Sequence, residues 1–187
     1  MDRVTLPSLL AAFGLAWIVA AQPPKDATSL AGQVELARLV DLAAERLHLR
    51  VQYDPAALKA AGSVTLRLDS GLGDSELWAL TNRVLAERGL TTVQIPGGLG
   101  YSVLKVADAA GKADVFAEHD AGPKPGFRVA VARAKHRPAK ELVDAASKVL
   151  SKPGGMAQAV GESGLILIAD LSSGVDQALS LLELIHV

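Results

Sequence analysis

A stretch rich in alanine, glycine and proline interrupts the chain at residues 107–126 and limits what the rest can fold into. The stretch has no sustained periodicity, whereas the sequence on either side alternates between helical and strand patterns. It therefore predicts a linker between two modules, at residues 22–106 and 127–187, and modules of that size hold only a few helices and strands. We expect an α+β fold in which the helices of each module pack on short mixed sheets.

In the first module, amphipathic helix patterns alternate with short strand patterns. Residues 34–47 place leucine and valine on one arc of a helix and the charged side chains on the opposite arc. A second helix pattern lies at residues 75–88, with Asp74 as the expected N-cap and Gly89 as the stop. Strands are expected at residues 49–53, 64–68, 90–95 and 101–106.

The second module has the predicted order β-α-β-β-α. Its first helix begins at Pro138, because proline suits the first position of a helix. Ser173 and Asp176 resemble a capping box for a final helix that ends near Ile185. Strands are expected at residues 127–132, 156–160 and 165–169, and the last two form a hairpin across the turn at 161–164.

Residues 1–21 have the features of a secretory signal peptide. Arg3 precedes an apolar run at residues 9–19, and the small side chains of Val19 and Ala21 suit a cleavage site. We expect the segment to be removed, which leaves a periplasmic chain without a membrane span; an uncleaved anchor is the alternative. The chain has no cysteine, so it folds there without disulfides.

The composition excludes several kinds of chemistry. The net charge of −1 gives no excess of cations for nucleic acid, and the lack of cysteine excludes thiol catalysis and cysteine-ligated metals. The four histidines have no ligand spacing, and no serine has histidine and aspartate in a recognisable catalytic pattern. We therefore predict no catalytic residue, no cofactor and no metal, and the chain is not expected to be an enzyme.

Two features point to protein partners. Residues 121–140 contain six cations and no acid, which suits an acidic protein partner or a neighbouring subunit, although a solvated strand edge and loop would have the same composition. The strand at 64–68 offers an edge for pairing. The predicted partner contacts are Val64, Leu66, Leu68, Arg128, Arg133, Lys135, Arg137 and Lys140.

The order of these patterns resembles that of the periplasmic modules at the N-terminus of bacterial secretins. The first module is similar to the first secretin module, which is related to the signalling domain of TonB-dependent receptors, and the second is similar to the KH-like second module. In the first module the resemblance rests on residues 50–55 (RVQYDP), 62–66 (GSVTL) and 102–106 (SVLKV). In the second it rests on residues 128–131 (RVAV), 138–142 (PAKEL) and 165–170 (LILIAD).

The resemblance implies a non-enzymatic interaction module of a type II secretion or type IV pilus system. Its partners would be secretion-system proteins, such as an inner-membrane platform or cargo, or identical subunits in a ring associated with the outer membrane. The 187 residues have no room for the pore barrel of a secretin, so we expect a truncated secretin or a stand-alone accessory protein. The alternatives are a receptor-type signalling or ligand-sensing module and a KH-type nucleic-acid binder.

Overall fold

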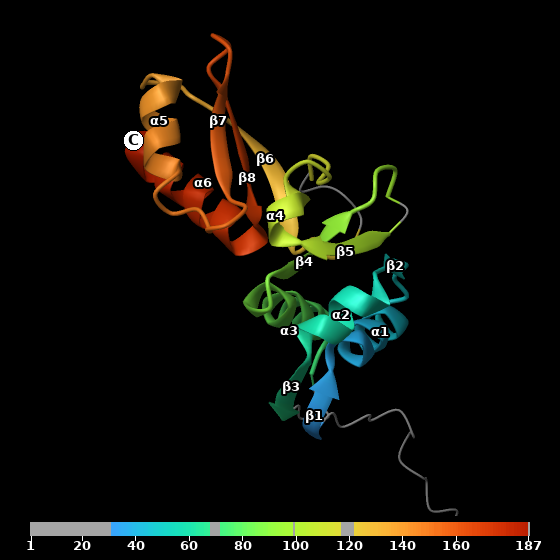
Figure 1. The fold of residues 1–187 in the computed structure, drawn as a ribbon. Coiled ribbons are helices and arrows are strands. Elements are labelled where there is room, and N and C mark those ends of the chain that lie inside the picture. The colour runs from blue at the N-terminus through green and yellow to red at the C-terminus, as the bar shows by residue number, and fades with distance from the viewer. Residues whose placement is uncertain (1–30, 68–71, 99, 117–121, 187) are drawn as a thin grey trace, which may run out of the picture.

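The computed structural model describes residues 31–67, 72–98, 100–116 and 122–186. In the view of Figure 1 the blue to green elements from the start of the described chain lie at the bottom, the orange to red elements from its end lie at the top, and the yellow-green elements lie between them. The predicted α+β class is confirmed, since helices pack beside three small sheets. Strand pairing is mixed in one of these sheets and antiparallel throughout the other two.

The N-terminal half contains a two-stranded ribbon, a three-stranded sheet and the helices between them. The ribbon pairs β1 with β3 in antiparallel fashion, and the sheet has the order β2-β5-β4, with β2 parallel to β5. In chain order the elements are β1 (Ala31–Glu35), α1 (Leu36–Arg46), β2 (Val51–Gln52), α2 (Pro55–Ala61), β3 (Ser63–Arg67), α3 (Asp74–Glu87), β4 (Leu90–Gln94), β5 (Tyr101–Lys105) and α4 (Val106–Ala109).

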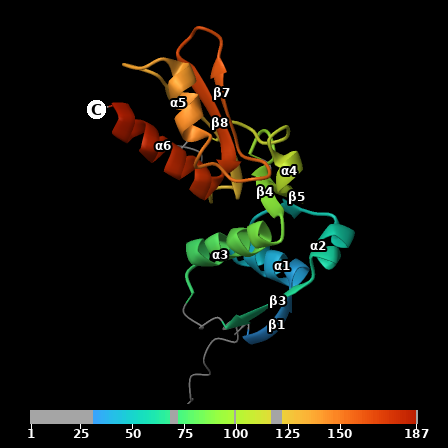
Figure 2. The ribbon, with the colours of Figure 1, turned by 60° about the vertical axis from the view of Figure 1, so that its left-hand side comes forward.

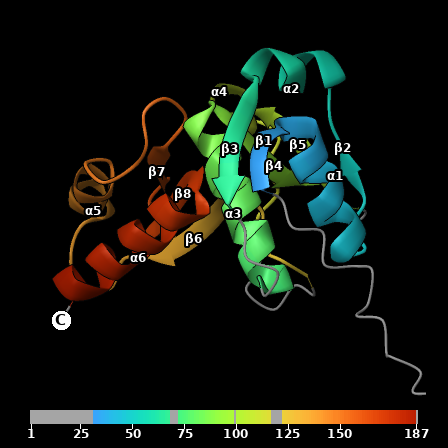
Figure 3. The same ribbon diagram turned by 90° about the horizontal axis from the view of Figure 1, so that it is seen from below.

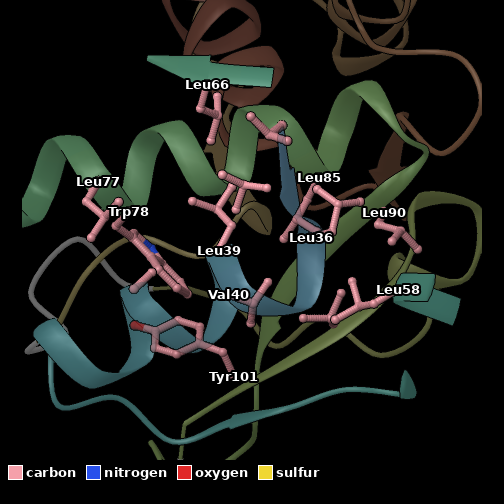
Figure 4. Close-up of a cluster of buried hydrophobic side chains, with 14 residues drawn as sticks. Leu36, Leu39, Val40, Leu58, Leu66, Leu77, Trp78, Leu85, Leu90 and Tyr101 are labelled. Carbon is pink, nitrogen blue, oxygen red and sulfur yellow. The ribbon is translucent and has the colours of Figure 1, made fainter. Parts of the chain in front are cut away.

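The apolar arcs of α1 and α3 form the core of this half. Leu36, Leu39 and Val40 of α1 are buried against Leu77 and Leu85 of α3, as their spacing along each helix predicts (Figure 4). The β1–β3 ribbon and the start of β5 close this core with the side chains of Val34, Leu66 and Tyr101.

The C-terminal half consists of β6 (Phe127–Arg133), α5 (Ala139–Ala146), β7 (Met156–Val160), β8 (Leu165–Leu171) and α6 (Ser172–His186). The three strands form an antiparallel sheet in the order β6-β8-β7, and α5 and α6 lie on one face of it (Figure 2). A second core between sheet and helices includes Leu142, Ile166, Ile168, Val175 and Leu182. The predicted order β-α-β-β-α and the hairpin are confirmed.

A third apolar cluster joins the two halves. It contains Val93 of β4 and Val106 of α4 from one half, and Phe127, Val129 and Ala169 from the other. Part of the segment predicted as a linker takes part in the contact: α4 extends to Ala109, and the amide of Phe116 donates to the Val129 oxygen at 3.2 Å. Where one module ends and the next begins stays a prediction.

The start of α1 differs from the prediction. Residues 34 and 35 were expected to be helical, but they end strand β1, and Glu35 has the extended angles φ −68° and ψ 142°. Val34 is buried through its pairing with Val64, so the same apolar residue satisfies a strand as well as a helix. The pairing with β3 decides between them, because it provides main-chain hydrogen bonds along the inner side of residues 31–35 and also packs Val34 in the core.

Helix α2 is not among the elements expected from the sequence, where the strand at residues 49–53 is followed directly by the strand at 64–68. The Asp54 carboxylate accepts a hydrogen bond of 2.9 Å from the Ala56 amide, and Pro55 occupies the first helical turn. Both are ordinary features of a helix start. The same pair of residues therefore ends one element and begins the next.

Two predicted helix caps are also wrong. Helix α3 already includes Asp74, and the carboxylate of Glu76 accepts the Gly73 amide at 2.8 Å. Helix α6 begins at Ser172, so Ser173 is helical rather than the cap, and Asp176 forms an ion pair with Arg128. A buried guanidinium requires a charged partner, and that requirement decides where Asp176 binds.

Candidate interaction surfaces

The β1–β3 ribbon lies at the end of the N-terminal half that is remote from the C-terminal half (Figures 1 and 2). Within the described part of the chain, each of its strands has the other as its sole strand partner. The outer edges therefore present main-chain groups that can accept an added strand. The side-chain amide of Gln33 donates to the Ser63 hydroxyl at 2.6 Å and links the two strands where the ribbon meets α1.

The side chains of β3 that were predicted as partner contacts turn toward the core. Leu66 is buried and Val64 is half-buried, and both pack in the core of the N-terminal half. The exposed side chains of β3 are Thr65, which lies between Val64 and Leu66, and Arg67, which follows Leu66. Contact through β3 would thus use its edge and these two side chains; Leu68 lies outside the described residues.

Four of the predicted cations form an exposed basic segment at the end of β6 and the start of α5. The basic segment consists of Arg133, Lys135, Arg137 and Lys140, and all four are exposed. Arg137 lies 3.8 Å from Glu141 one turn along the chain, and such an exposed pair contributes little to stability. For the other three, no acidic side chain of the described residues lies within ion-pair distance.

Arg128 does not belong to this exposed surface. Its side chain is 1% exposed, and its guanidinium forms a hydrogen-bonded ion pair with Asp176 of α6. The prediction that Arg128 meets a partner assumed an exposed strand, whereas the residue points to the face that α5 and α6 cover. In this fold Arg128 joins β6 to α6.

A groove of about 420 Å³ lies where α3 meets the segment before β6 and the start of α6. Trp78 and Pro123 give it apolar walls, and Arg83 and Lys124 add two cations. Its floor is tight at Gly126, where a Cβ atom would lie 2.5 Å from the Asn82 oxygen. Sequence reasoning missed this groove, because its lining comes from three segments that are far apart in the chain.

One titratable side chain on the surface of the N-terminal half has a shifted pKa. The Tyr53 hydroxyl donates to the Asp41 carboxylate at 2.6 Å. This hydrogen bond raises the pKa of Tyr53 above 10.0, and partial burial and the nearby negative charge raise it further. The pair ties the segment after β2 to α1.

Among the described residues, no three histidine, cysteine, aspartate or glutamate side chains come close enough to hold a metal ion. Nor does any described helix have the length and apolar character that crossing a membrane requires.

No protein-family model and no curated protein sequence matches this chain. Solved structures do. The chain aligns with one chain of the Klebsiella pneumoniae type II secretion system outer membrane complex of PulD, PulS and the PulC HR domain, with a TM-score of 0.62 and 17% identity. The alignment covers 84% of this chain and 26% of that chain, so this chain spans about a quarter of its length.

Two further matches have lower scores. The N-terminal domain of the secretin XcpQ from Pseudomonas aeruginosa aligns with a TM-score of 0.30 and 15% identity, over 85% of this chain and 64% of that one. A chain of the GspC–GspD complex from enterotoxigenic Escherichia coli aligns with a TM-score of 0.33 and 13% identity, over 84% of this chain and 96% of that one. The first alignment alone carries the assignment: this chain has the fold of secretin N-terminal modules.

Proposed function

We propose that this chain is a non-enzymatic periplasmic interaction module of a secretin-type secretion or pilus system. The observation that carries the proposal is the fold similarity, which extends over 84% of the chain and thus over both halves in the same order. The secretory features of residues 1–21 support a periplasmic location.

Two surfaces are available for the contacts that such a module makes. The edges of the β1–β3 ribbon offer main-chain groups to an added strand. The basic segment offers four exposed cations, which attract an acidic surface and speed its approach. Because the two surfaces belong to different halves of the chain, a single chain can bind a partner protein at one surface and a neighbouring subunit at the other.

We assign the basic segment to a secretion-system protein with an acidic surface, from the inner-membrane platform or the cargo, and the ribbon to a partner or a ring of identical subunits. The basic segment gives the sharper test, because its four side chains are exposed and their substitution leaves both cores intact.

The experiment is capture of the tagged full chain from envelopes of its own host, with identification of what binds. We expect a secretion-system component to bind the wild type and to be lost when Arg133, Lys135, Arg137 and Lys140 are replaced by glutamate. The matched control replaces four exposed cations elsewhere by glutamate and should keep the partner: Lys59, Lys105, Lys112 and Lys148. Circular dichroism checks that both variants fold.

Three outcomes would contradict the proposal. Equal binding to both charge-reversed variants would remove the basic segment from the contact. Capture of a receptor or its regulator, with no secretion component, would favour the receptor-type signalling module. A salt-dependent shift of RNA or DNA by the wild type, lost when the basic segment is reversed, would favour a nucleic-acid binder.

A further inference from the structure

Strand β7 is an open sheet edge that carries no charge. It is the outer strand of the order β6-β8-β7, and within the described residues it pairs with β8 alone. Its five residues are Met-Ala-Gln-Ala-Val, without the lysine, proline or bulge that natural proteins use to protect such an edge. Met156 and Val160 are 38% and 46% exposed, so two large apolar side chains stand at this edge.

The other outer strands are charged or covered. In the β1–β3 ribbon, β1 ends in Glu35 and β3 ends in Arg67. The outer side of β6 is bridged at Val129 by Val115 and ends in Arg133. Strand β4 has no charge, but four of its five residues are buried, and Val93 packs in the cluster between the halves. Among strands of five or more residues, β7 is thus both open and uncharged over its described length.

The two faces of β7 differ in a regular way. Ala157 and Ala159 are half-buried on the face that α5 and α6 cover, and Ala157 packs in the core there. Met156, Gln158 and Val160 are exposed on the opposite face. Gln158 lies at the centre, with alanine on both sides and a large apolar residue at each end. The strand therefore reads almost the same in both directions.

We propose that two copies of this chain pair through antiparallel β7 edges around a two-fold axis at Gln158. In this register Gln158 faces Gln158 of the second copy, each Met156 faces a Val160, and each Ala157 faces an Ala159. Apolar side chains that face each other across antiparallel strands, such as Met156 and Val160, stabilise the pairing, and the two Gln158 side-chain amides can hydrogen-bond to each other. The result is one six-stranded sheet with the helices of both copies on the same face.

The charges beside β7 suit this arrangement. Glu162 is exposed in the turn after β7, and Lys152 is exposed in the segment before it. When the strands run antiparallel, the turn of one copy approaches the segment before β7 of the other, at both ends of the pair. In this register Glu162 faces Gly154 of the second copy, two positions from Lys152, so opposite charges lie near each other at both ends of the pair.

The interface is small. Five residues from each copy bury less than the roughly 1,200 Å² of a standard stable interface. We therefore expect a reversible dimer whose population rises with protein concentration, rather than a permanent one.

The test uses sedimentation equilibrium of the full chain and of two variants, Gln158→Lys and Gln158→Glu. Residue 158 faces its own copy across the axis, so either variant alone places like charges opposite each other, and we expect dimerisation at least about tenfold weaker. An equal mixture of the two variants should dimerise again, because lysine then faces glutamate. No misfolded variant would give this rescue on mixing.

Gln52→Lys is the matched control, since Gln52 is also an exposed glutamine in an outer strand, and it should dimerise like the wild type. Gln158→Cys should form a disulfide-linked dimer under mild oxidation, because directly opposite residues lie within disulfide reach and the chain has no other cysteine. A wild type that stays monomeric at high concentration, or a mixture that fails to dimerise, would overturn the pairing. The capture variants leave β7 unchanged, so either proposal can fail without the other.

Discussion

The indole of Trp78 donates a hydrogen bond of 2.7 Å to the main-chain oxygen of Lys124 and so ties α3 to the segment that leads into β6. The ring of Tyr101 lies beside that of Trp78 (Figure 4), with 5.0 Å between the ring centres. The Tyr101 hydroxyl donates to the main-chain oxygen of Pro123, the residue before Lys124. Two aromatic side chains of the N-terminal half thus fix the position of residues 123 and 124, which lead into the C-terminal half.

Replacing Trp78 by phenylalanine should lower the free energy of unfolding by about 2 kcal/mol, since the change removes a hydrogen bond and part of a buried ring. Tyr101→Phe removes a hydroxyl alone and should cost about 1 kcal/mol. Urea unfolding measures both. If the two variants unfold at the same urea concentration as the wild type, these bonds do not stabilise the junction.

Breaking the Arg128–Asp176 pair should have an asymmetric cost. Arg128 is 1% exposed and Asp176 is 54% exposed, so Asp176→Ala leaves a buried charge without its partner and should cost about 3 kcal/mol. Arg128→Met leaves a carboxylate that water can solvate, and should cost less. Thermal unfolding compares them, with Glu183→Ala on the exposed side of α6 as the control. Equal losses would show that burial of the charge is not the cause.

The Tyr53–Asp41 hydrogen bond should make stability depend on alkaline pH. Because the folded state raises the pKa of Tyr53, the bond contributes fully below 10.0 and its contribution is lost as the pH rises through the raised pKa. The free energy of unfolding of Tyr53→Phe should therefore fall less steeply above about pH 10 than that of the wild type. Asp41→Asn should bring the ultraviolet titration of Tyr53 back toward its ordinary pKa; an unchanged titration would contradict the assignment.

Gly100 should tolerate no side chain. Its φ is +133°, and a Cβ atom would lie 2.3 Å from the Arg50 oxygen, which accepts the Tyr101 amide where β2 meets β5. Gly100→Ala should therefore cost about 3 kcal/mol or more. At Gly97 φ is +82° with nothing within 4 Å, so Gly97→Ala should cost about 1 kcal/mol from backbone strain alone. Urea unfolding that places both variants together would show that the contact with Arg50 has no effect.

The elements that could be predicted are those with a strong local pattern. Helices α1 and α3 follow from apolar spacing, and the β7–β8 hairpin follows from two apolar runs around a glycine-containing turn. Strand β1 could not be predicted this way, because Gly32, Gln33 and Glu35 show little apolar alternation. Its pairing with β3 depends on residues about thirty positions away.

The candidate surfaces divide in the same way. The exposure of Arg133, Lys135 and Arg137 follows from a run of cations, because lysine and arginine are rarely buried without a partner. Arg128 looked like a member of that run, and only the fold brings Asp176 to it from 48 positions along the chain. The groove beside Trp78 likewise depends on α6 returning to α3, as Figure 3 shows from below.

The apolar cluster between the halves has a consequence for any attempt to divide the molecule. Val93 and Val106 on one side pack against Phe127, Val129 and Ala169 on the other, and this packing removes apolar surface of both halves from water. A chain cut between residues 107 and 126 would give two fragments, and each fragment would expose the apolar surface that the other half covers in the intact chain. Solubility, rather than secondary structure, would then decide whether either fragment could be studied alone.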